Sequence, residues 1–301
     1  VHSPCFSTPT RFAPTRFALT TFVFFRSTSP VSFAFVSEFS VWLRSDGGHV
    51  TLTAEDKGMD LVERDQFAGQ RVQQNLLPSS GAKIGKLSFD YRILPSLILS
   101  GDSIEFVELS DGRVVFYIAD VSGHGAAGAL VSVLVKGICA GLMTDVEKKV
   151  LEHPSNVLEA LNSALRNFDI DQHVTMFLGI LDPKNNVLHF SNAAHFPAPI
   201  LIADQSLDYL EFGSLPLGIY QSPDYQSKSL HLPNEYTIVM FSDGVLETMD
   251  QPTIKDKEER LQLLVKSGKR DVDSLAKELG IDGARNAPDD IAIFTITSSG
   301  R

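Results

Sequence analysis

The sequence has almost no cysteine and too few basic residues to balance its acids. Only Cys5 and Cys139 are cysteines among 301 residues, so neither a disulfide framework nor a cysteine-based metal site is supported. Cys139 lies in the apolar run 131–143, where it is most simply a small core residue. The net charge of −11 argues against nucleic acid as the main partner.

Long uninterrupted hydrophobic runs are also lacking. The most apolar stretch, residues 17–42, is broken by Arg26, Pro30 and Glu38, so no window resembles a transmembrane helix. We therefore expect a cytoplasmic protein without membrane association. The content of 43% hydrophobic residues is still enough for a sizeable core.

The first 50 residues contain no lysine and nine of the twenty phenylalanines. They show no sustained helical or strand period, so residues 1–55 are predicted to be an irregular or disordered N-terminal extension. Arg and Ser with few acids are also typical of an organelle transit peptide. The favoured interpretation is a non-native or mis-assigned extension without a packed fold.

Residues 56–78 are predicted to form a linker helix that ends at Pro78. Its apolar stripe consists of Leu61, Ala68, Val72 and Leu76, and Gln73 is assigned to the polar face. A single amphipathic helix ahead of a domain is usually a packing or dimerisation element, so a homodimer formed through this helix is expected.

Residues 79–301 read as a single α+β domain. Strands are predicted at 86–94, 103–109, 114–119, 174–181, 187–192, 198–202, 227–231, 237–241 and 291–297, and helices at 125–143, 156–167, 255–266 and 272–279. Asp111-Gly112 between two apolar runs is a strong hairpin signal. Hairpins in two groups with long helices between them favour α+β layering over alternating βαβ units.

Four aspartates lie where apolar strands run out into turns: Asp102, Asp120, Asp243 and Asp289. Strand ends are where a fold can bring distant carboxylates together, and four such groups would repel one another and raise each other's pKa. Two divalent cations would remove that repulsion, and carboxylate ligands suit Mg²⁺ or Mn²⁺. Paired metals are a standard device for attacking a phosphate ester with metal-bound water.

The segment from Gly123 to Gly128 also has the G-x-G-x-x-G spacing of dinucleotide-binding turns. That interpretation requires a second strand after the helix, ending in an acid that binds ribose. The helix is instead followed by a polar stretch and another predicted helix, so the dinucleotide interpretation is disfavoured.

Several motifs together resemble one known family. They are Ser100-Gly101-Asp102, Asp120-Val121-Ser122-Gly123-His124-Gly125, Asn192-Ala193-Ala194-His195, Leu217-Gly218, Ser242-Asp243-Gly244 and Asp289-Asp290-Ile291. In this order, over residues 60–296, they resemble the SpoIIE/RsbU-type metal-dependent serine/threonine phosphatases, a bacterial branch of the phosphatase 2C-like superfamily. The segment 68–78 resembles the helix that often links such a domain to a receiver or sensor domain.

The resemblance implies a four-layer αββα sandwich with a binuclear Mn²⁺ or Mg²⁺ site at one edge. It implies that Asp120 bridges both metals, that Asp243 and Asp289 complete one site, and that Asp102 and the carbonyl of Val121 serve the other. Asp120 and Asp102 are the expected catalytic residues.

The chain departs from the family pattern at four positions outside the expected metal ligands: Ser100, Glu105, Ala194 and Ala292. His195 is expected to shape a loop and His124 to be a turn residue. Asp290 is expected either to be a solvated neighbour of the site or to contact the ligand residues without binding a metal itself.

The predicted function is hydrolysis of phosphoserine or phosphothreonine on a signalling protein by metal-bound water. The resemblance implies that this substrate is a small phosphorylated anti-sigma-factor antagonist. The alternative is a catalytically weak regulatory module of the same fold that binds its partner without turning it over.

Overall fold

The computed structural model describes residues 61–143, 149–168, 170–203, 206–281 and 287–300. The chain divides into two units, Val1–Lys57 and Gly58–Arg301, and the fold below is that of the second. The predicted extension of residues 1–55 lies outside the described residues, as do residues 56–60 of the predicted linker helix.

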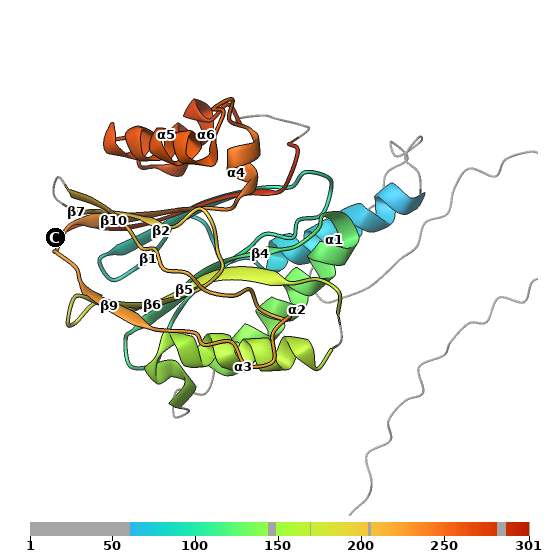
Figure 1. Ribbon diagram of the computed structural model, residues 1–301, viewed down its shortest axis with the longest axis horizontal. Helices are drawn as coiled ribbons and strands as arrows, with labels where there is room; N and C mark the ends of the chain where they lie inside the picture. The colour runs from blue at the N-terminus through green and yellow to red at the C-terminus, as the bar shows by residue number, and fades with distance from the viewer. Residues whose placement is uncertain (1–60, 144–148, 169, 204–205, 282–286, 301) are drawn as a thin grey trace, which may run out of the picture. The chain divides into compact units, whose positions relative to one another are not determined.

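Two antiparallel sheets form the centre of the domain (Figure 1). One sheet has the strand order β1 (Ala82–Ile84), β2 (Leu87–Leu94), β11 (Ile291–Ser298), β10 (Tyr236–Phe241), β7 (Ile200–Ala203) and β8 (Ser206–Tyr209). The other has the order β3 (Ser103–Glu108), β4 (Val114–Val121), β5 (Val174–Asp182), β6 (Val187–Ala193) and β9 (Lys228–His231). Every pairing between these eleven described strands is antiparallel, as the predicted hairpins require.

Helices cover the outer face of each sheet (Figure 1). The helices are α1 (Leu61–Leu76), α2 (Gly125–Met143), α3 (Pro154–Arg166), α4 (Gly244–Glu247), α5 (Ile254–Lys266) and α6 (Val272–Glu278), with a 3₁₀ turn at Lys149–Glu152. Helices α2 and α3 lie on the sheet that contains β4, and α5 and α6 lie on the sheet that contains β10. The predicted αββα order of layers is confirmed.

Strand β4 shows why the sequence folds into these layers. Side chains alternate between the two faces of a strand, and residues 114–119 are all buried. Val115, Tyr117 and Ala119 face the core under α2 and α3. Val114, Phe116 and Ile118 face the core between the sheets. A strand with both faces covered reads as a continuous apolar run, which is what the sequence displays.

Two residues of the apolar stripe predicted for the linker helix, Ala68 and Val72, do not face the domain, whereas Leu76 lines a cavity between the helix and the domain. Ala68, Val72 and Leu76 are exposed, Val72 by 56%, whereas Gly69 and Gln73 are half-buried against the domain. Val72 therefore does not pack on the domain, which leaves its predicted role in dimerisation untested, whereas the assignment of Gln73 to a polar face without contacts is wrong. The helix contacts the domain through Gly69, which lies against the side chain of Leu99, and through the amide of Gln73, which bonds the backbone of Ser100.

Among the described helices, α2 alone is long and apolar enough to cross a membrane by length and composition. This differs from the expectation that no window resembles a transmembrane helix. In the fold, α2 packs on β4 and α3, and its buried residues include Ala129, Val131, Val135 and Cys139. Packing in the core accounts for the apolar residues on its buried face, whereas Leu130 on the other face is 72% exposed.

Candidate metal centre

The four aspartates are brought to one edge of the sandwich by the way the chain passes between the sheets. Strand β2 ends at Leu94, and the chain then crosses to the other sheet, where Asp102 directly precedes β3. Asp120 is the penultimate residue of β4, whose Ala119 pairs with Ser103 at the start of β3. These two acids therefore lie at the ends of neighbouring strands.

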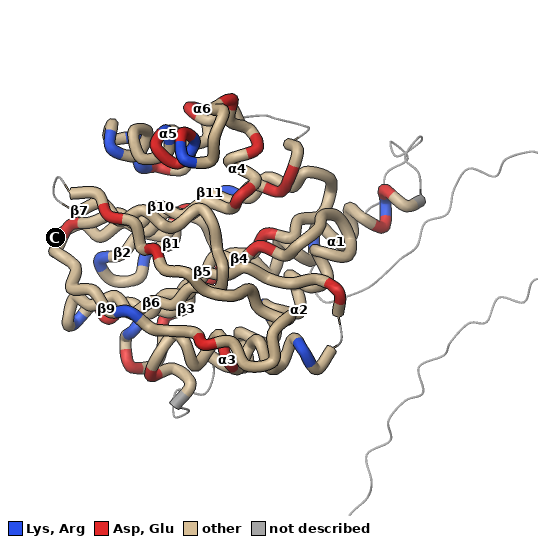
Figure 2. Tube along the Cα trace, viewed as in Figure 1, with Lys and Arg blue, Asp and Glu red and all other residues tan. Residues whose placement is uncertain are grey.

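The other two acids reach the same edge from the first sheet. Asp243 follows the end of β10, and Asp289 precedes the start of β11, where Phe241 pairs with Ile293. Ile291 in turn pairs with Leu94, the residue from which the chain crosses to Asp102. Figure 2 shows acidic positions near α4 and near the end of β4, on the same side of the sandwich.

Glycines allow these segments to pack backbone against backbone. A Cβ on Gly101 would lie 2.9 Å from the carbonyl oxygen of Val121, and one on Gly244 would lie 2.1 Å from the carbonyl oxygen of Asp290. Both distances are too short for a side chain, so the glycines of Ser-Gly-Asp and Ser-Asp-Gly are needed where two backbone segments lie in contact. The Val121 carbonyl expected to serve a metal thus lies against the residue before Asp102.

Asp102 is a buried carboxylate with unmet hydrogen-bonding capacity. The residue is 3% exposed, and neither of its carboxylate oxygens has a hydrogen-bond partner within the part of the chain that the structure describes. Burial, followed by the charge of Asp120, raises its pKa well above the usual range, and the nearby Ser242 hydroxyl only partly opposes this rise. A buried charged group without a partner is costly, so this side chain needs either a proton or a cation.

Asp120 and Asp243 show the same electrostatic conflict. Burial and the charges of Asp243 and Asp289 raise the pKa of Asp120 to about 8. Burial and the charge of Asp289 raise the pKa of Asp243. Asp120 therefore interacts electrostatically with all three of the other acids, Asp102, Asp243 and Asp289.

The donor chemistry fits hard divalent cations. All the candidate ligands are oxygens, which is the preference of Mg²⁺ and Mn²⁺, and positive charge would relieve the repulsion that raises these pKa values. No group of three or more His, Cys, Asp or Glu residues in the described ranges is close enough to hold a metal as it stands. The fold thus brings the four acidic segments to one edge, while the side chains of the described residues do not form a ready-made metal site.

Asp290 has a structural role that the sequence did not reveal. It is 4% exposed, so the expectation of a solvated neighbour is wrong. Its Oδ1 accepts hydrogen bonds from the backbone N–H and the hydroxyl of Ser96 at 2.6 and 2.8 Å, and its Oδ2 accepts one from the N–H of Gly101 at 2.7 Å. Asp290 therefore ties the crossing segment that carries Asp102 to the start of β11, in the supporting role that was the other expectation.

Ser242 and Gln73 are further residues that sequence reasoning missed. The Ser242 hydroxyl accepts a hydrogen bond from the N–H of Ala292 at 2.7 Å, which joins the end of β10 to β11 beside Asp243 and Asp289. Gln73 bonds the backbone of Ser100 from α1. A serine or glutamine in a polar segment gives no sequence signal for such long-range contacts.

The two histidines differ in environment. His124 is exposed in the turn between β4 and α2, as expected of a turn residue. His195 is 3% exposed and follows β6, where its N–H donates to Oδ1 of Asn192 at 2.9 Å. Both ring nitrogens of His195 lack partners among the described residues, and burial lowers its pKa to about 4.

The dinucleotide interpretation is not supported by the topology. Strand β4 pairs antiparallel with β3 and β5, and the next described elements after α2 are a 3₁₀ turn and α3. The glycines at 123–128 therefore do not belong to a parallel βαβ unit.

Comparison with known proteins agrees with this fold. The family model described as Stage II sporulation protein E (SpoIIE) matches residues 110–298. Phosphoserine phosphatase RsbU of Bacillus subtilis (strain 168) is 32% identical over 178 residues, which are 58% of this chain and 51% of that protein. The chain spans about half the length of this relative.

Two solved structures share the fold. The SiaA-PP2C domain of Pseudomonas aeruginosa superposes with a TM-score of 0.65 at 19% identity, over 79% of this chain and 97% of that one. RsbX in complex with magnesium gives a TM-score of 0.54 at 16% identity, over 72% of this chain and 98% of that one. Because the family model matches more than half of the sequence, the chain belongs to the SpoIIE family.

Proposed function

We propose that the protein is a Mn²⁺- or Mg²⁺-dependent phosphatase that hydrolyses phosphoserine or phosphothreonine on a protein substrate. The observation that carries this proposal is the gathering of four acidic segments at one edge, with both carboxylate oxygens of buried Asp102 unpartnered among the described residues. The similarity to a phosphoserine phosphatase and to a fold solved with magnesium supports it.

Within this proposal each residue has a distinct task. Asp120, which interacts electrostatically with the other three acids, would contribute to both cation sites. Asp243 and Asp289 would complete one site, and Asp102 and the carbonyl of Val121 would hold the other. The cations supply an acidified water and positive charge that stabilises the phosphoryl oxygens in the transition state. Asp290 and Ser242 keep the ligand-bearing segments in register.

The substrate that we propose is a small phosphorylated signalling protein, in particular an anti-sigma-factor antagonist. This part rests on the family resemblance, since no described side chain identifies a partner. The net charge of −11 is consistent with a protein substrate and unfavourable for nucleic acid.

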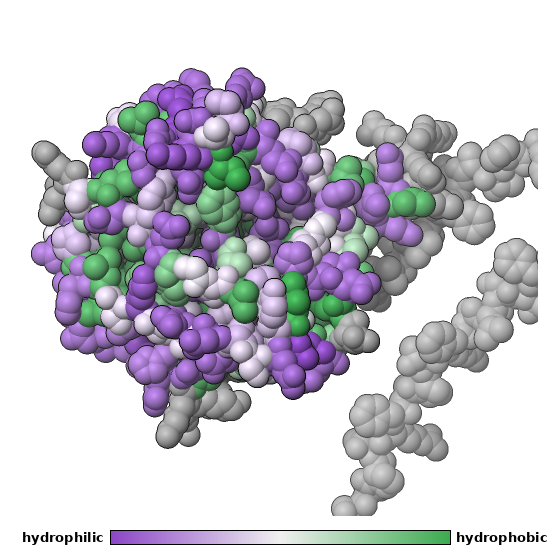
Figure 3. Space-filling model, in the orientation of Figure 1, coloured by the Kyte–Doolittle hydropathy of each residue, from purple (hydrophilic) through white to green (hydrophobic). Residues whose placement is uncertain are grey.

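We also propose that α1 pairs with α1 of a second copy. Val62, Val72 and Leu76, which lie within roughly 80° of one another around the helix, are 60%, 56% and 41% exposed, and Figure 3 shows hydrophobic residues interspersed with hydrophilic ones on the protruding helix. An isolated helix of this length is marginal in water, so a partner for this side would stabilise it. Val72→Asp should lower the dimer fraction in sedimentation velocity. Arg71→Gln, which changes the net charge by the same amount at an exposed position on another side of the helix, should not.

Phosphate release from a phosphoserine protein, with and without Mn²⁺, tests the activity. Asp120→Asn removes the central carboxylate charge and should lower turnover by at least ~10²-fold, the scale of losing one electrostatic stabiliser. Asp208→Asn is the matched control, because Asp208 is exposed on edge strand β8, and it should keep wild-type turnover. Wild-type turnover in Asp120→Asn, or no Mn²⁺-dependent release by the wild type, would favour the catalytically weak module instead.

A further inference from the structure

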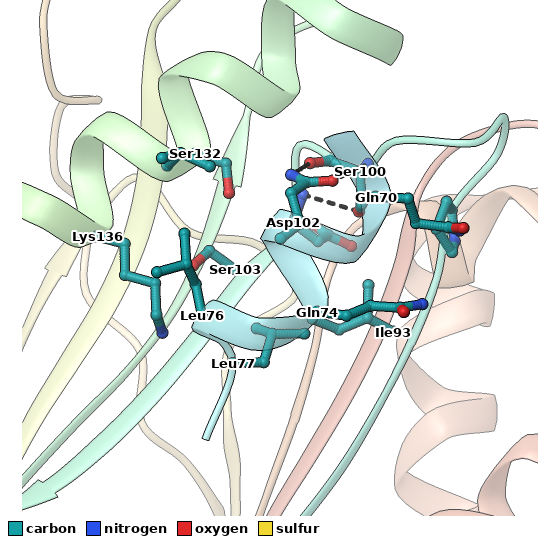
Figure 4. Close-up of a pocket in the computed structure, with 13 residues that line it drawn as sticks. Gln70, Gln74, Leu76, Leu77, Ile93, Ser100, Asp102, Ser103, Ser132 and Lys136 are labelled. Carbon is teal, nitrogen blue, oxygen red and sulfur yellow. Dashed lines mark hydrogen bonds between the residues drawn. The ribbon is translucent and has the colours of Figure 1, made fainter. Parts of the chain in front are cut away.

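Helix α1 holds the backbone next to Asp102 through one side chain. The amide Nε2 of Gln73 donates to the carbonyl oxygen of Ser100 at 2.8 Å, and its Oε1 accepts from the N–H of Ser100 at 3.2 Å. Figure 4 shows this contact at the labelled Ser100. Both backbone groups of Ser100 are therefore paired with a single amide, as they would be with a neighbouring strand.

The contact is relayed to Asp102 by a second hydrogen bond. The hydroxyl of Ser100 accepts from the N–H of Asp102 at 3.1 Å. On the other side, Asp290 accepts from the N–H of Gly101 at 2.7 Å. Residues 100–102 are thus held by the carboxylate of Asp290 and by the amide of Gln73. Of these two contacts, only the one made by Gln73 depends on the position of α1.

A cavity beside Asp102 increases the importance of the contact between Gln73 and Ser100. A cavity of about 70 Å³ separates α1 from the domain, and Gln73, Ser100, Asp102 and Lys136 are among its lining residues (Figure 4). Because open space lies beside Asp102, its position is not fixed by close packing on this side. Lys136 does not compensate its charge, since its Nζ lies 2.6 Å from Glu105.

We propose that Gln73 is a positioning residue that sets the affinity of the Asp102 carboxylate for a divalent cation. The inference rests on the proposed function for the identity of the ligand, Mn²⁺ or Mg²⁺. With Gln73 bonded to Ser100, the 100–102 backbone presents Asp102 toward Asp120. When the bond is absent, the carboxylate loses this orientation and the cation binds more weakly.

Gln73→Met tests the proposal, because methionine keeps the length and helix propensity of glutamine but makes neither hydrogen bond. Titration calorimetry of the full chain with Mn²⁺ should show affinity about tenfold weaker, the lower end of the effect of removing a group that orients a metal ligand. Phosphate release should need correspondingly more Mn²⁺ yet reach a limiting rate within about twofold of wild type. Asn75→Met, at an exposed position of the same helix, should bind Mn²⁺ like wild type.

Two further measurements separate positioning from loss of α1 docking. Ser100→Ala leaves the backbone groups that Gln73 bonds but removes the hydroxyl that accepts from Asp102, so it should also weaken Mn²⁺ binding. Hydrogen exchange at the Ser100 amide should accelerate in Gln73→Met. Accelerated exchange with unchanged Mn²⁺ affinity in both variants would overturn the inference. Failure of the wild type to bind Mn²⁺ would instead overturn the proposed function.

Discussion

At the scale of single residues, the adjacent aspartates Asp289 and Asp290 have different structural roles. Asp289 and Asp290 are neighbours in sequence, yet only Asp290 is buried and saturated with hydrogen bonds from Ser96 and Gly101. The sequence identifies the acidic pair at the start of a strand, but not which member faces the crossing segment. That choice depends on the path of residues 95–101, which no local pattern encodes.

Asp290→Asn should destabilise the domain. The amide nitrogen that replaces one carboxylate oxygen would face a backbone N–H, so one buried donor loses its partner, at a cost of about 1–3 kcal/mol. Urea unfolding followed by circular dichroism measures this difference. Asp289→Asn is the control for charge, since Asp289 is only half-buried, and an equal loss in both variants would contradict the assigned role of Asp290.

His195 should make stability depend on pH. Burial lowers its pKa in the folded protein to about 4, whereas an unfolded histidine titrates near 6.5. Between these values the unfolded chain binds the extra proton. The contribution is therefore complete above about pH 6.5 and is lost as the pH falls toward 4, by up to about 3 kcal/mol.

The measurement is the free energy of unfolding at pH 5 and pH 7 for the wild type and His195→Gln, which cannot titrate. The difference between the two proteins isolates this histidine from other groups. A wild type that loses no more stability than the variant on acidification would show that the ring is charged or solvated in the folded state.

At the scale of elements, prediction succeeded where a local period is strong. Helix α2 has the predicted bounds, and the hairpin β3–β4 turns at the predicted Asp-Gly pair. Strands β1 and β8 were missed because each has only three or four residues at a sheet edge. The face of α1 that meets the domain was not predicted because its contacts are made by Gly69 and Gln73, which hydrophobic periodicity cannot detect.

Gly179 in β5 should tolerate no side chain. A Cβ there would lie 2.3 Å from the Cζ atom of Phe116 on the neighbouring strand, and that ring packs against Phe177 and Phe294 at centroid distances of 6.3 and 6.2 Å. Gly179→Ala should cost about 1–3 kcal/mol by overpacking.

The matched control for Gly179→Ala is Gly137→Ala on α2. Gly137 is exposed and has open space around it, so alanine there should stabilise the domain by about 0.5–1 kcal/mol through helix propensity. Melting temperatures of the two variants should move in opposite directions. A melting temperature of Gly179→Ala equal to that of the wild type would mean that the Phe116 ring moves to accommodate the added methyl group.

At the scale of the whole molecule, the layered fold and the edge that carries the acids could be predicted, whereas the site geometry could not. Burial patterns and hairpin turns depend on residues close together in the sequence, so strands such as β4 can be identified from the sequence. The contacts of Asp290 with Gly101 and of Gln73 with Ser100 join residues 189 and 27 positions apart. Such contacts depend on how two sheets stack, which the sequence specifies only through the complete core.

The metal-free domain should carry a global electrostatic cost that cations remove. Burial and mutual repulsion raise the pKa of Asp102, Asp120 and Asp243, so a ligand that binds only the folded state and neutralises these groups must stabilise it. Mn²⁺ at one hundred times its dissociation constant should add about 2.7 kcal/mol. For a domain of this size that corresponds to roughly 5–10 °C in melting temperature.

Differential scanning fluorimetry in EDTA and in Mn²⁺ measures this shift, and the variants locate it. Asp120→Asn should melt at or above the wild type in EDTA, because one repelling charge is gone, and should lose most of the Mn²⁺ shift. Asp208→Asn should keep the full shift. If Mn²⁺ stabilised Asp120→Asn as much as the wild type, the cation would be binding elsewhere, and the repulsion among these aspartates would have to be relieved by protons alone.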